Sequence, residues 1–303
     1  MNIIIAGATG LIGTKLVESL LQEKHQITLI SRNALQAISK FGNRVKAITW
    51  DMPVQQMATI LSQQDAIINL AGEGVGEKKW TDLRKEQILN SRINSIQKLT
   101  TALALANKKP SVVLQASAIG YYGSTENAVN ENSEHGSGFL ADVCLKWEKA
   151  AQQFSTFDMR TVILRTGVVL TPDGGALKQF ILPFSMFAGG PIGSGKQYIS
   201  WIHIDDQIRA MLFLLKSATA NGIYNLTAPN PVSMSEFTNA LGKAMNRPSW
   251  LRVPGIALKL TMGQMADEMV LQGQQVVPQK LLTDGFQFEF IHIQNALSNL
   301  LNK

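Results

Sequence analysis

The sequence predicts an α/β protein: a doubly wound parallel sheet of about seven strands, followed by a smaller mixed α/β C-terminal lobe. Three observations support this class. Short apolar segments alternate with amphipathic ones through the first half of the 303 residues. The apolar segments are hydrophobic along their length, which is typical of strands covered by helices on both faces. After residue 170 this alternation gives way to Gly- and Pro-rich loops around isolated helices.

Seven segments carry the strand signal. In chain order they are NIIIAG, QITLISR, RVKAITWD, QDAIINLAG, SVVLQASA, MRTVILRTGVVL and GIYNLTA. Helical periodicity or a capped polar start marks the segments 11–25, 35–40, 84–106, 140–154, 204–215 and 233–248.

The change of pattern after residue 170 sets the expected domain limits. We expect residues 1–170 plus about 204–225 to form the sheet domain, and about 171–203 and 226–303 to form the lobe. The segment from about Val253 to Lys303 has no motif that indicates a role.

Composition narrows the class of partner. The net charge is +6, but the Lys and Arg residues are scattered, which argues against nucleic acid and favours an anionic small molecule. The single cysteine, Cys144, excludes an internal disulfide framework and suits a reducing compartment, so a cytoplasmic protein is expected. No apolar stretch reaches the roughly 18 residues of a membrane span. A homodimer remains a candidate assembly.

The histidines give no indication of a metal site. They are far apart and lack ligand spacing, so no bound metal is expected. They are His25, His135, His203 and His292.

The segment GATGLIG connects the first expected strand to the first expected helix. Gly7 permits a tight turn, Gly10 lets backbone amides approach a pyrophosphate, and Gly13 lets the helix pack close to the sheet. The helix N-terminus adds partial positive charge. This context predicts a Rossmann-type dinucleotide site lined also by Thr9, Leu11 and Ile12. The alternative is a glycine-rich turn without a ligand.

The end of the second strand bears on the choice of cofactor. A carboxylate there would favour NAD(H), whereas Ser31 and Arg32 offer a hydroxyl and a guanidinium that suit a 2′-phosphate. We therefore expect NADP(H) in preference to NAD(H), unless Arg32 is simply an exposed loop residue. Asp51 is a candidate for the adenine amino group or an ordinary surface carboxylate. The fourth strand ends in NLAG, Asn69 to Gly72, where small residues let the backbone reach a ribose. Leu70, Ala71 and Gly72 are therefore expected among the cofactor-binding residues.

Several motifs together resemble one family in order along the chain. They are GATGLIG, INLAG, SAIGYYG, LRTGVVL, WIHIDD and YNLTAPNPVSMSEF, together with Asn94 and Glu131. The chain is similar to the extended short-chain dehydrogenase/reductases, in the epimerase/dehydratase branch. More narrowly it resembles the bacterial and organellar "epimerase family proteins", also labelled SulA-like, which carry a C-terminal domain of unknown function.

This resemblance implies bound NAD(P), a C-terminal lobe that closes on substrate, and a trio of Ser/Thr, Tyr and Lys. The tyrosine exchanges a proton with the substrate oxygen, and the lysine holds the nicotinamide ribose. Asn94 and Arg165 are placed with the cofactor-binding residues, although Arg165 could also bind an anionic substrate or cap a loop.

The segment GFLADVCLKWEKAA departs from the family pattern. If Glu148 marks the glutamate that follows the family lysine by four residues, Cys144 stands at the lysine position and Leu140 at the tyrosine position. A leucine has no proton to transfer, and a thiol supplies no fixed positive charge. Lys146 and Lys149 lie on other sides of the helix.

Other side chains are candidates to replace the acid/base pair. Ser117 fits the Ser/Thr position, with doubt of one residue in register. Tyr121 and Tyr122 follow it, although at least one should pack in the core, and His203 is either an acid/base or a structural histidine.

The sequence thus indicates an NADP(H)-binding oxidoreductase or epimerase-like protein. Its substrate would be a small carbonyl or hydroxyl compound, or a sugar-nucleotide-like one. The alternative is a non-catalytic NADP(H)-binding sensor or scaffold.

Overall fold

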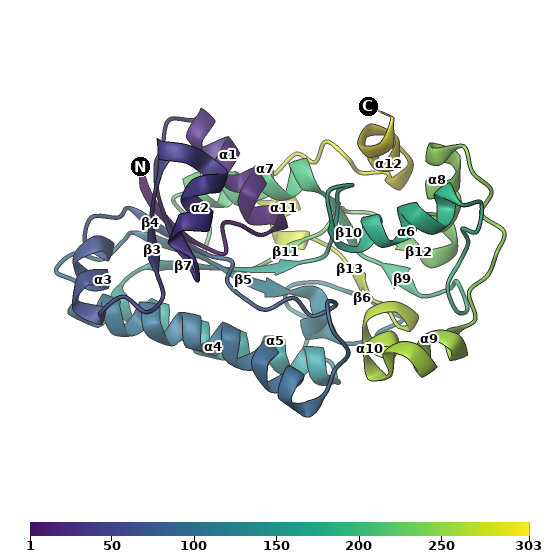
Figure 1. Ribbon diagram of the computed structural model, residues 1–303, viewed down its shortest axis with the longest axis horizontal. Helices are drawn as coiled ribbons and strands as arrows, with labels where there is room; N and C mark the ends of the chain where they lie inside the picture. The colour runs from purple at the N-terminus through teal and green to yellow at the C-terminus, as the bar shows by residue number, and fades with distance from the viewer. Residues whose placement is uncertain (303) are drawn as a thin grey trace.

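A seven-stranded sheet forms the centre of the computed structural model, which describes residues 1–302 (Figure 1). The strand order is β11-β7-β5-β4-β1-β2-β3, and all neighbours are parallel. The strands are β1 (Asn2–Ala6), β2 (Gln26–Ser31), β3 (Val45–Thr49), β4 (Ala66–Asn69), β5 (Val112–Ala118), β7 (Arg160–Thr166) and β11 (Gly222–Leu226). The predicted doubly wound sheet is confirmed, with its switch point between β1 and β4.

Helices cover both faces of this sheet, as Figure 1 shows. On one face lie α1 (Leu11–Gln22), α2 (Ala34–Phe41) and α7 (Ile204–Lys216), and on the other α3 (Val54–Leu61), α4 (Asp82–Leu105) and α5 (Phe139–Ala151). Successive side chains of β1 point to opposite faces of the sheet, so they contribute to two separate hydrophobic cores. Ile3 and Ile5 pack with the first group, whereas Ile4 packs with the second. Both faces of the sheet are therefore buried under helices, which explains why the strands are apolar along their whole length.

The sixth predicted strand is in fact two strands. β7 ends at Thr166, and Val168–Leu170 forms β8, which pairs with β10 (Trp201–His203) outside the main sheet. Gly167 lies at the break, where an added methyl group would stand 2.6 Å from the carbonyl oxygen of Ser200. Only a residue without a side chain allows this approach, and it redirects the chain towards the lobe.

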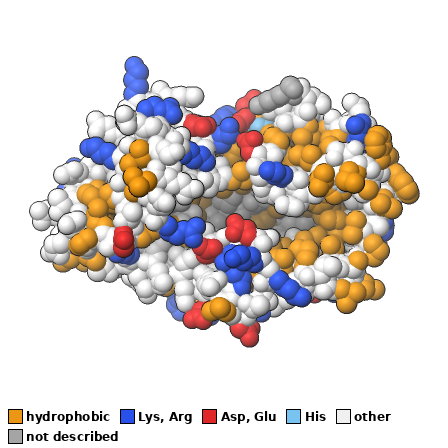
Figure 2. Space-filling model, in the orientation of Figure 1, with side chains coloured by type: hydrophobic (Ala, Val, Ile, Leu, Met, Phe, Trp, Pro, Cys, Tyr) orange, Lys and Arg blue, Asp and Glu red, His pale blue; other side chains and the backbone are white. Residues whose placement is uncertain are grey.

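Short elements lie around the carboxyl ends of the strands and are called the lobe. They are β6 (Ala128–Val129), α6 (Gly175–Ser185), β9 (Tyr198–Ile199), β12 (Val232–Ser233), α8 (Met234–Met245), α9 (Gly255–Met262), α10 (Gln264–Ala266), β13 (Gln275–Val276), α11 (Gln279–Thr283) and α12 (Ile293–Leu301). The strand β6 is included, although it precedes residue 170, because it pairs with β13. Between the sheet domain and the lobe, the face in Figure 2 is hollowed, and charged side chains stand along its rim.

The C-terminal segment is tied back to the sheet domain. β13 pairs with β6, and the buried carboxylate of Asp206 accepts hydrogen bonds from the backbone amides of Glu289 and Phe290 at 3.0 and 2.8 Å. Leu281 and Phe286 join the main hydrophobic core. Within residues 1–302, none of the helices has the length and apolar character that crossing a bilayer requires.

Candidate functional site

The glycine turn has the geometry of a phosphate cradle. Gly7 has φ +78°, and a methyl group added there would lie 2.6 Å from the carbonyl carbon and oxygen of Leu70. A methyl group at Gly13 would lie 2.3 Å from the carbonyl oxygen of Gly7. Gly10 begins α1 without a side-chain cap, so the first amides of the helix, beside Leu11, are open to a ligand. Thr9 is exposed, and Leu11 and Ile12 are half-buried at the same edge.

Basic side chains stand beside this turn. Arg32 follows Ser31 at the end of β2, is 84% exposed, and donates to Glu73 at 2.5 Å. Lys40 of α2 reaches back to the carbonyl oxygen of Thr9 at 3.3 Å and to the hydroxyl of Thr14 at 2.7 Å. Lys40 is not among the residues that the sequence motifs indicate, although its place in the last turn of the helix after β2 points it towards the glycine turn.

Glu73 is shared by two arginines. It accepts from Arg32 and from the buried Arg84, at 3.2 Å, and the hydrogen bond from Arg84 is the main cause that holds its pKa below the usual value. Asp51 is exposed in the turn after β3 and accepts a hydrogen bond from Thr49, which lowers its pKa. No neighbour in residues 1–302 fixes Asp51 to the crevice.

The end of β4 is fixed by a buried asparagine. The amide of Asn69 donates to Gln115 at 2.8 Å and to Ser95 at 3.2 Å, and its oxygen accepts from the backbone amide of Ala71. These bonds set the path of Leu70 to Gly72 beside the glycine turn. Asn94 is not part of this arrangement, because it lies on the exposed side of α4.

A buried polar network joins β5, α5 and β7. Ser117 donates to Glu148 at 2.6 Å, and Glu148 accepts two bonds from Arg165, both at 2.8 Å. Arg165 also donates to the hydroxyl of Tyr122 at 2.9 Å, and Tyr122 donates to Asn225 at 2.7 Å. Burial raises the pKa of Tyr122. These hydrogen bonds engage Ser117, Tyr122 and Arg165 with one another's network, and Arg165 forms a buried ion pair with Glu148. A role for Arg165 as a cofactor ligand stays a prediction.

Tyr121 differs from Tyr122. Its half-buried ring lies over the guanidinium of Arg165, with the central carbon 3.3 Å from the ring centroid. Its hydroxyl has no hydrogen-bond partner among the residues that the structure describes. A cation stacked on one side thus fixes the ring while leaving the phenol oxygen open to a ligand.

Helix α5 presents an apolar surface to this region. A methyl group added at Gly120 would meet the Cβ of Leu140 at 3.3 Å and the Sγ of Cys144 at 3.7 Å. Burial raises the pKa of the Cys144 thiol to about 12, which makes it unsuitable as a nucleophile near neutral pH. The N-terminus of α5 is capped from the C-terminal segment by Glu268, which accepts from the amides of Phe139 and Leu140 at 3.1 and 2.9 Å.

His203 lies away from this group of side chains. It is fully buried, accepts from the amide of Asp205 at 3.0 Å, and stacks on Phe290 with centroids 3.8 Å apart. Burial lowers its pKa, so the ring is held neutral. These contacts favour the structural interpretation of His203, as the cap of α7 and an anchor for the C-terminal segment. Residues 1–302 contain no group of three or more side chains arranged to hold a metal ion.

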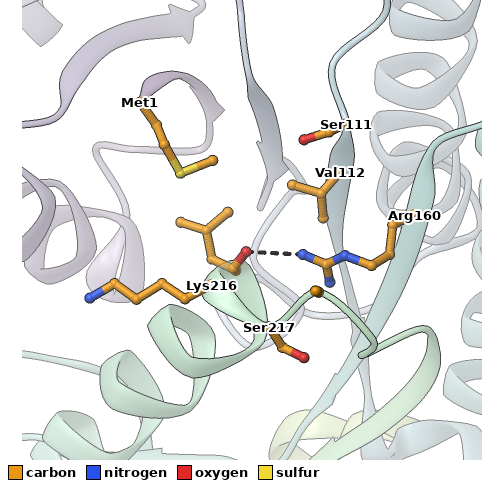
Figure 3. A pocket seen from close by; sticks show the side chains of 8 residues that line it. Met1, Ser111, Val112, Arg160, Lys216 and Ser217 are labelled. Atoms are coloured by element: carbon orange, nitrogen blue, oxygen red, sulfur yellow. Dashed lines mark hydrogen bonds between the residues drawn. The ribbon is translucent and has the colours of Figure 1, made fainter.

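A cavity at the opposite end of the sheet does not belong to the site. Met1, Ser111, Arg160 and Lys216 line it at the amino ends of β1, β5 and β7 (Figure 3). Arg160 is fully engaged there with backbone carbonyls, including that of Leu215 at 2.9 Å. Ligands of open α/β sheets bind at the carboxyl ends of the strands. This cavity lies at the amino ends, where the last residues of α7 line it, so it is not a candidate for the dinucleotide site.

The sheet order, the glycine turn and the polar crevice at the carboxyl edge define a protein of the dinucleotide-binding Rossmann class. The chain belongs to the NAD dependent epimerase/dehydratase family, whose model matches residues 3–227. Residues 253–300 match a domain of unknown function, DUF1731. The resemblance inferred from the sequence is thereby confirmed.

Relatives match over nearly the whole chain. The epimerase family protein SDR39U1 homolog, chloroplastic, of Arabidopsis thaliana is 38% identical over 99% of this chain and 87% of its own. The epimerase family protein YfhF of Bacillus subtilis is 36% identical over 99% and 98%. The cytoplasmic location stays a prediction, since the plant relative is named as chloroplastic.

Solved structures agree in fold. The human epimerase family protein SDR39U1 (isoform 2), crystallised with NADPH, has a TM-score of 0.89 at 31% identity and covers both chains completely. A UDP-glucuronic acid 4-epimerase from Bacillus cereus has a TM-score of 0.79 at 18% identity, over 100% of this chain and 98% of its own, and shares the fold alone.

Proposed function

We propose that this protein binds NADP(H) and interconverts a carbonyl and a hydroxyl group on a small substrate, with Tyr121 as its proton donor. The open phenol of Tyr121, stacked on the buried cation of Arg165 next to the apolar face of α5, carries the proposal. The other candidate groups, Ser117 and Tyr122, already donate their protons to buried acceptors.

The choice of NADP(H) rests on the basic side chains beside the glycine turn. Arg32 is highly exposed and pairs with Glu73 at the surface, where an ion pair contributes only about 0–1 kcal/mol. A 2′-phosphate can therefore take over the guanidinium at little cost, and Lys40 is close enough to the turn to assist. The human relative crystallised with NADPH supports the same cofactor.

The cofactor, when bound, supplies the hydride chemistry. The chain itself would orient the substrate and manage one proton. The hydroxyl of Tyr121 would give its proton to the substrate oxygen, and solvent at the open hydroxyl would return a proton to the phenol oxygen. In the opposite direction the same oxygen accepts the proton. Arg165 keeps the ring of Tyr121 in place because its own guanidinium is fixed by two hydrogen bonds to Glu148.

A matched pair of tyrosine variants tests this proposal. NADPH oxidation is followed by absorbance with a panel of aldehydes, ketones and keto-sugar nucleotides. Tyr121→Phe should lower kcat by about 10²-fold or more while leaving the Kd for NADPH unchanged. Tyr122→Phe removes two buried hydrogen bonds, one accepted from Arg165 and one donated to Asn225, and should lower Tm while keeping turnover in the remaining folded protein. Equal turnover in wild type and Tyr121→Phe would remove Tyr121 from the reaction.

A second candidate function is a non-catalytic NADP(H) sensor. The observation that favours it is the inert α5 face, where Leu140 and the thiol of Cys144 replace groups able to exchange protons. It predicts tight NADPH binding, no turnover with any carbonyl of the panel, and a set of captured proteins that changes when NADPH is added. Stabilisation by NADPH but not NADH in a thermal shift supports the cofactor choice in both cases.

A further inference from the structure

Arg92 occupies a slot at the carboxyl edge of β4. It extends from α4, and a methyl group added at Gly72 would lie 3.1 Å from its central guanidinium carbon. On another side the same carbon stands 4.8 Å from the ring of Trp147. The guanidinium is therefore held between the backbone that follows β4 and an indole of α5. The missing side chain of Gly72 makes room for Arg92.

Arg92 has no salt-bridge partner among residues 1–302, although the charge of Glu73 acts on it from further away. Its Nη1 donates to the carbonyl oxygen of Ile88, one turn earlier in α4, at 2.7 Å. No carboxylate in residues 1–302 forms an ion pair with it, whereas Arg84 has Glu73 and Arg165 has Glu148. Arginine stays charged in proteins, and an unpaired cation that is half-buried is costly. A cation kept in such a position is suited to an oxygen-rich ligand.

The position of Arg92 indicates which part of a ligand it meets. A dinucleotide crosses the sheet at the switch point between β1 and β4. The adenosine half belongs over β2 and β3, where Arg32 and Asp51 stand, so the nicotinamide half belongs over β4 and β5. Arg92 lies on that side, close enough to Cys144 for its charge to oppose the rise in the pKa of the thiol.

We propose that Arg92 binds the nicotinamide half of the cofactor, donating from its guanidinium to the ribose oxygens beside Gly72. It would thus supply from α4 the cation that position 144 of α5 lacks. This inference rests on the proposed function, because it requires NADP(H) in the crevice. It goes further by assigning a binding role to a residue that neither the motif pattern nor the buried network accounts for.

Two ligands separate the halves of the site: NADPH, and 2′,5′-ADP, which carries the adenosine half alone. Calorimetric titration of Arg92→Gln should show NADPH binding weakened about tenfold or more, as expected for a lost hydrogen bond from a charged group. The affinity for 2′,5′-ADP should not change. Arg32→Gln should weaken both ligands. Lys108→Gln, which removes an exposed charge just beyond α4, should leave both affinities unchanged.

Two further variants guard against a trivial loss of fold. Gly72→Ala leaves Arg92 in the chain but displaces its guanidinium, so it should reproduce the selective loss of NADPH affinity. Arg92→Lys keeps a positive charge and should restore part of the affinity that glutamine loses. Thermal melting without ligand checks that each variant is folded at the temperature of titration.

The outcomes are distinct. If the wild-type protein binds neither ligand, the proposed function fails. If it binds both, and Arg92→Gln binds both equally well, Arg92 has no role in the site and the inference is overturned. It is also overturned if Arg92→Gln weakens both ligands to the same extent, because the effect is then a general disturbance of the fold. Selective loss of NADPH affinity supports it.

Discussion

Replacing Glu148 by glutamine should destabilise the fold strongly, because one carboxylate holds a whole buried network. Glu148 accepts one bond from Ser117 and two from Arg165, and the side chains of the ion pair are 8% and 1% exposed. Glutamine keeps one acceptor oxygen, so at least one charged bond at 2.8 Å is lost and Arg165 remains as a buried cation. Breaking a buried pair in this way costs about 3–5 kcal/mol. Counting two weakened charged bonds at about 1.5–3 kcal/mol each gives about 3–6 kcal/mol, which overlaps this range.

Urea denaturation, monitored by tryptophan fluorescence, measures this loss. Ser117→Ala is the matched control, since it removes one bond to Glu148 and leaves the ion pair intact; it should lose about 1–3 kcal/mol. Combining Glu148→Gln with Arg165→Met removes both charges and should recover part of the stability. A loss below about 1 kcal/mol for Glu148→Gln would refute the reasoning, because that is the value of an exposed pair.

Three further predictions concern single positions. Gly13→Ala should lower unfolding free energy by about 1–3 kcal/mol and weaken NADPH binding, because the new methyl group meets the carbonyl of Gly7; unchanged Tm and Kd would contradict it. The Cys144 thiol, with its pKa raised by burial to about 12, should react with a maleimide at neutral pH only as the protein opens, so its labelling rate should follow urea concentration. The lowered pKa of His203 means that the unfolded chain takes up a proton first as pH falls, so stability should decline below about pH 6.5. The charges of Asp205, Asp206 and Glu289 raise the pKa of His203 and so oppose this decline. His203→Asn, which keeps a capping acceptor, should flatten the decline of stability with pH in urea titrations.

The glycine turn could be predicted because its requirements are local. A strand, a positive φ at Gly7 and a helix start lie within a few residues, so the motif contains nearly all of its own geometry. The break at Gly167 could not, because it depends on the approach of Ser200 from a distant loop. The same is true of Glu268, which caps α5 from 128 residues further along the chain.

The position of Asn94 on α4 depends on the helical period. The family resemblance places Asn94 with the cofactor-binding residues, yet its side chain is exposed and lies two positions before the buried Ile96, about 200° away on the helix. The buried positions Ile88, Ser95 and Ile96 mark the inward face, and Arg92 lies next to that face, four residues after Ile88. Helical period alone therefore places Arg92 nearer than Asn94 to the inward face of α4. What it could not supply was the contact with Gly72, which lies in the segment that follows β4.

If Arg92 is the cation of the site, its presence on α4 and the absence of the family lysine at position 144 of α5 are coupled. A lysine at position 144 would then stand beside a second positive charge in a buried place, at a repulsive cost on the order of 1 kcal/mol or more. Cys144→Lys alone should therefore be destabilised by several kcal/mol. In the Arg92→Gln background, the same substitution should cost less and should restore part of the NADPH affinity. A double-mutant cycle, with urea stability and NADPH Kd as its two readouts, measures the coupling. If the two substitutions are additive in both readouts, positions 92 and 144 do not share one cation site, and the apolar face of α5 needs a different explanation.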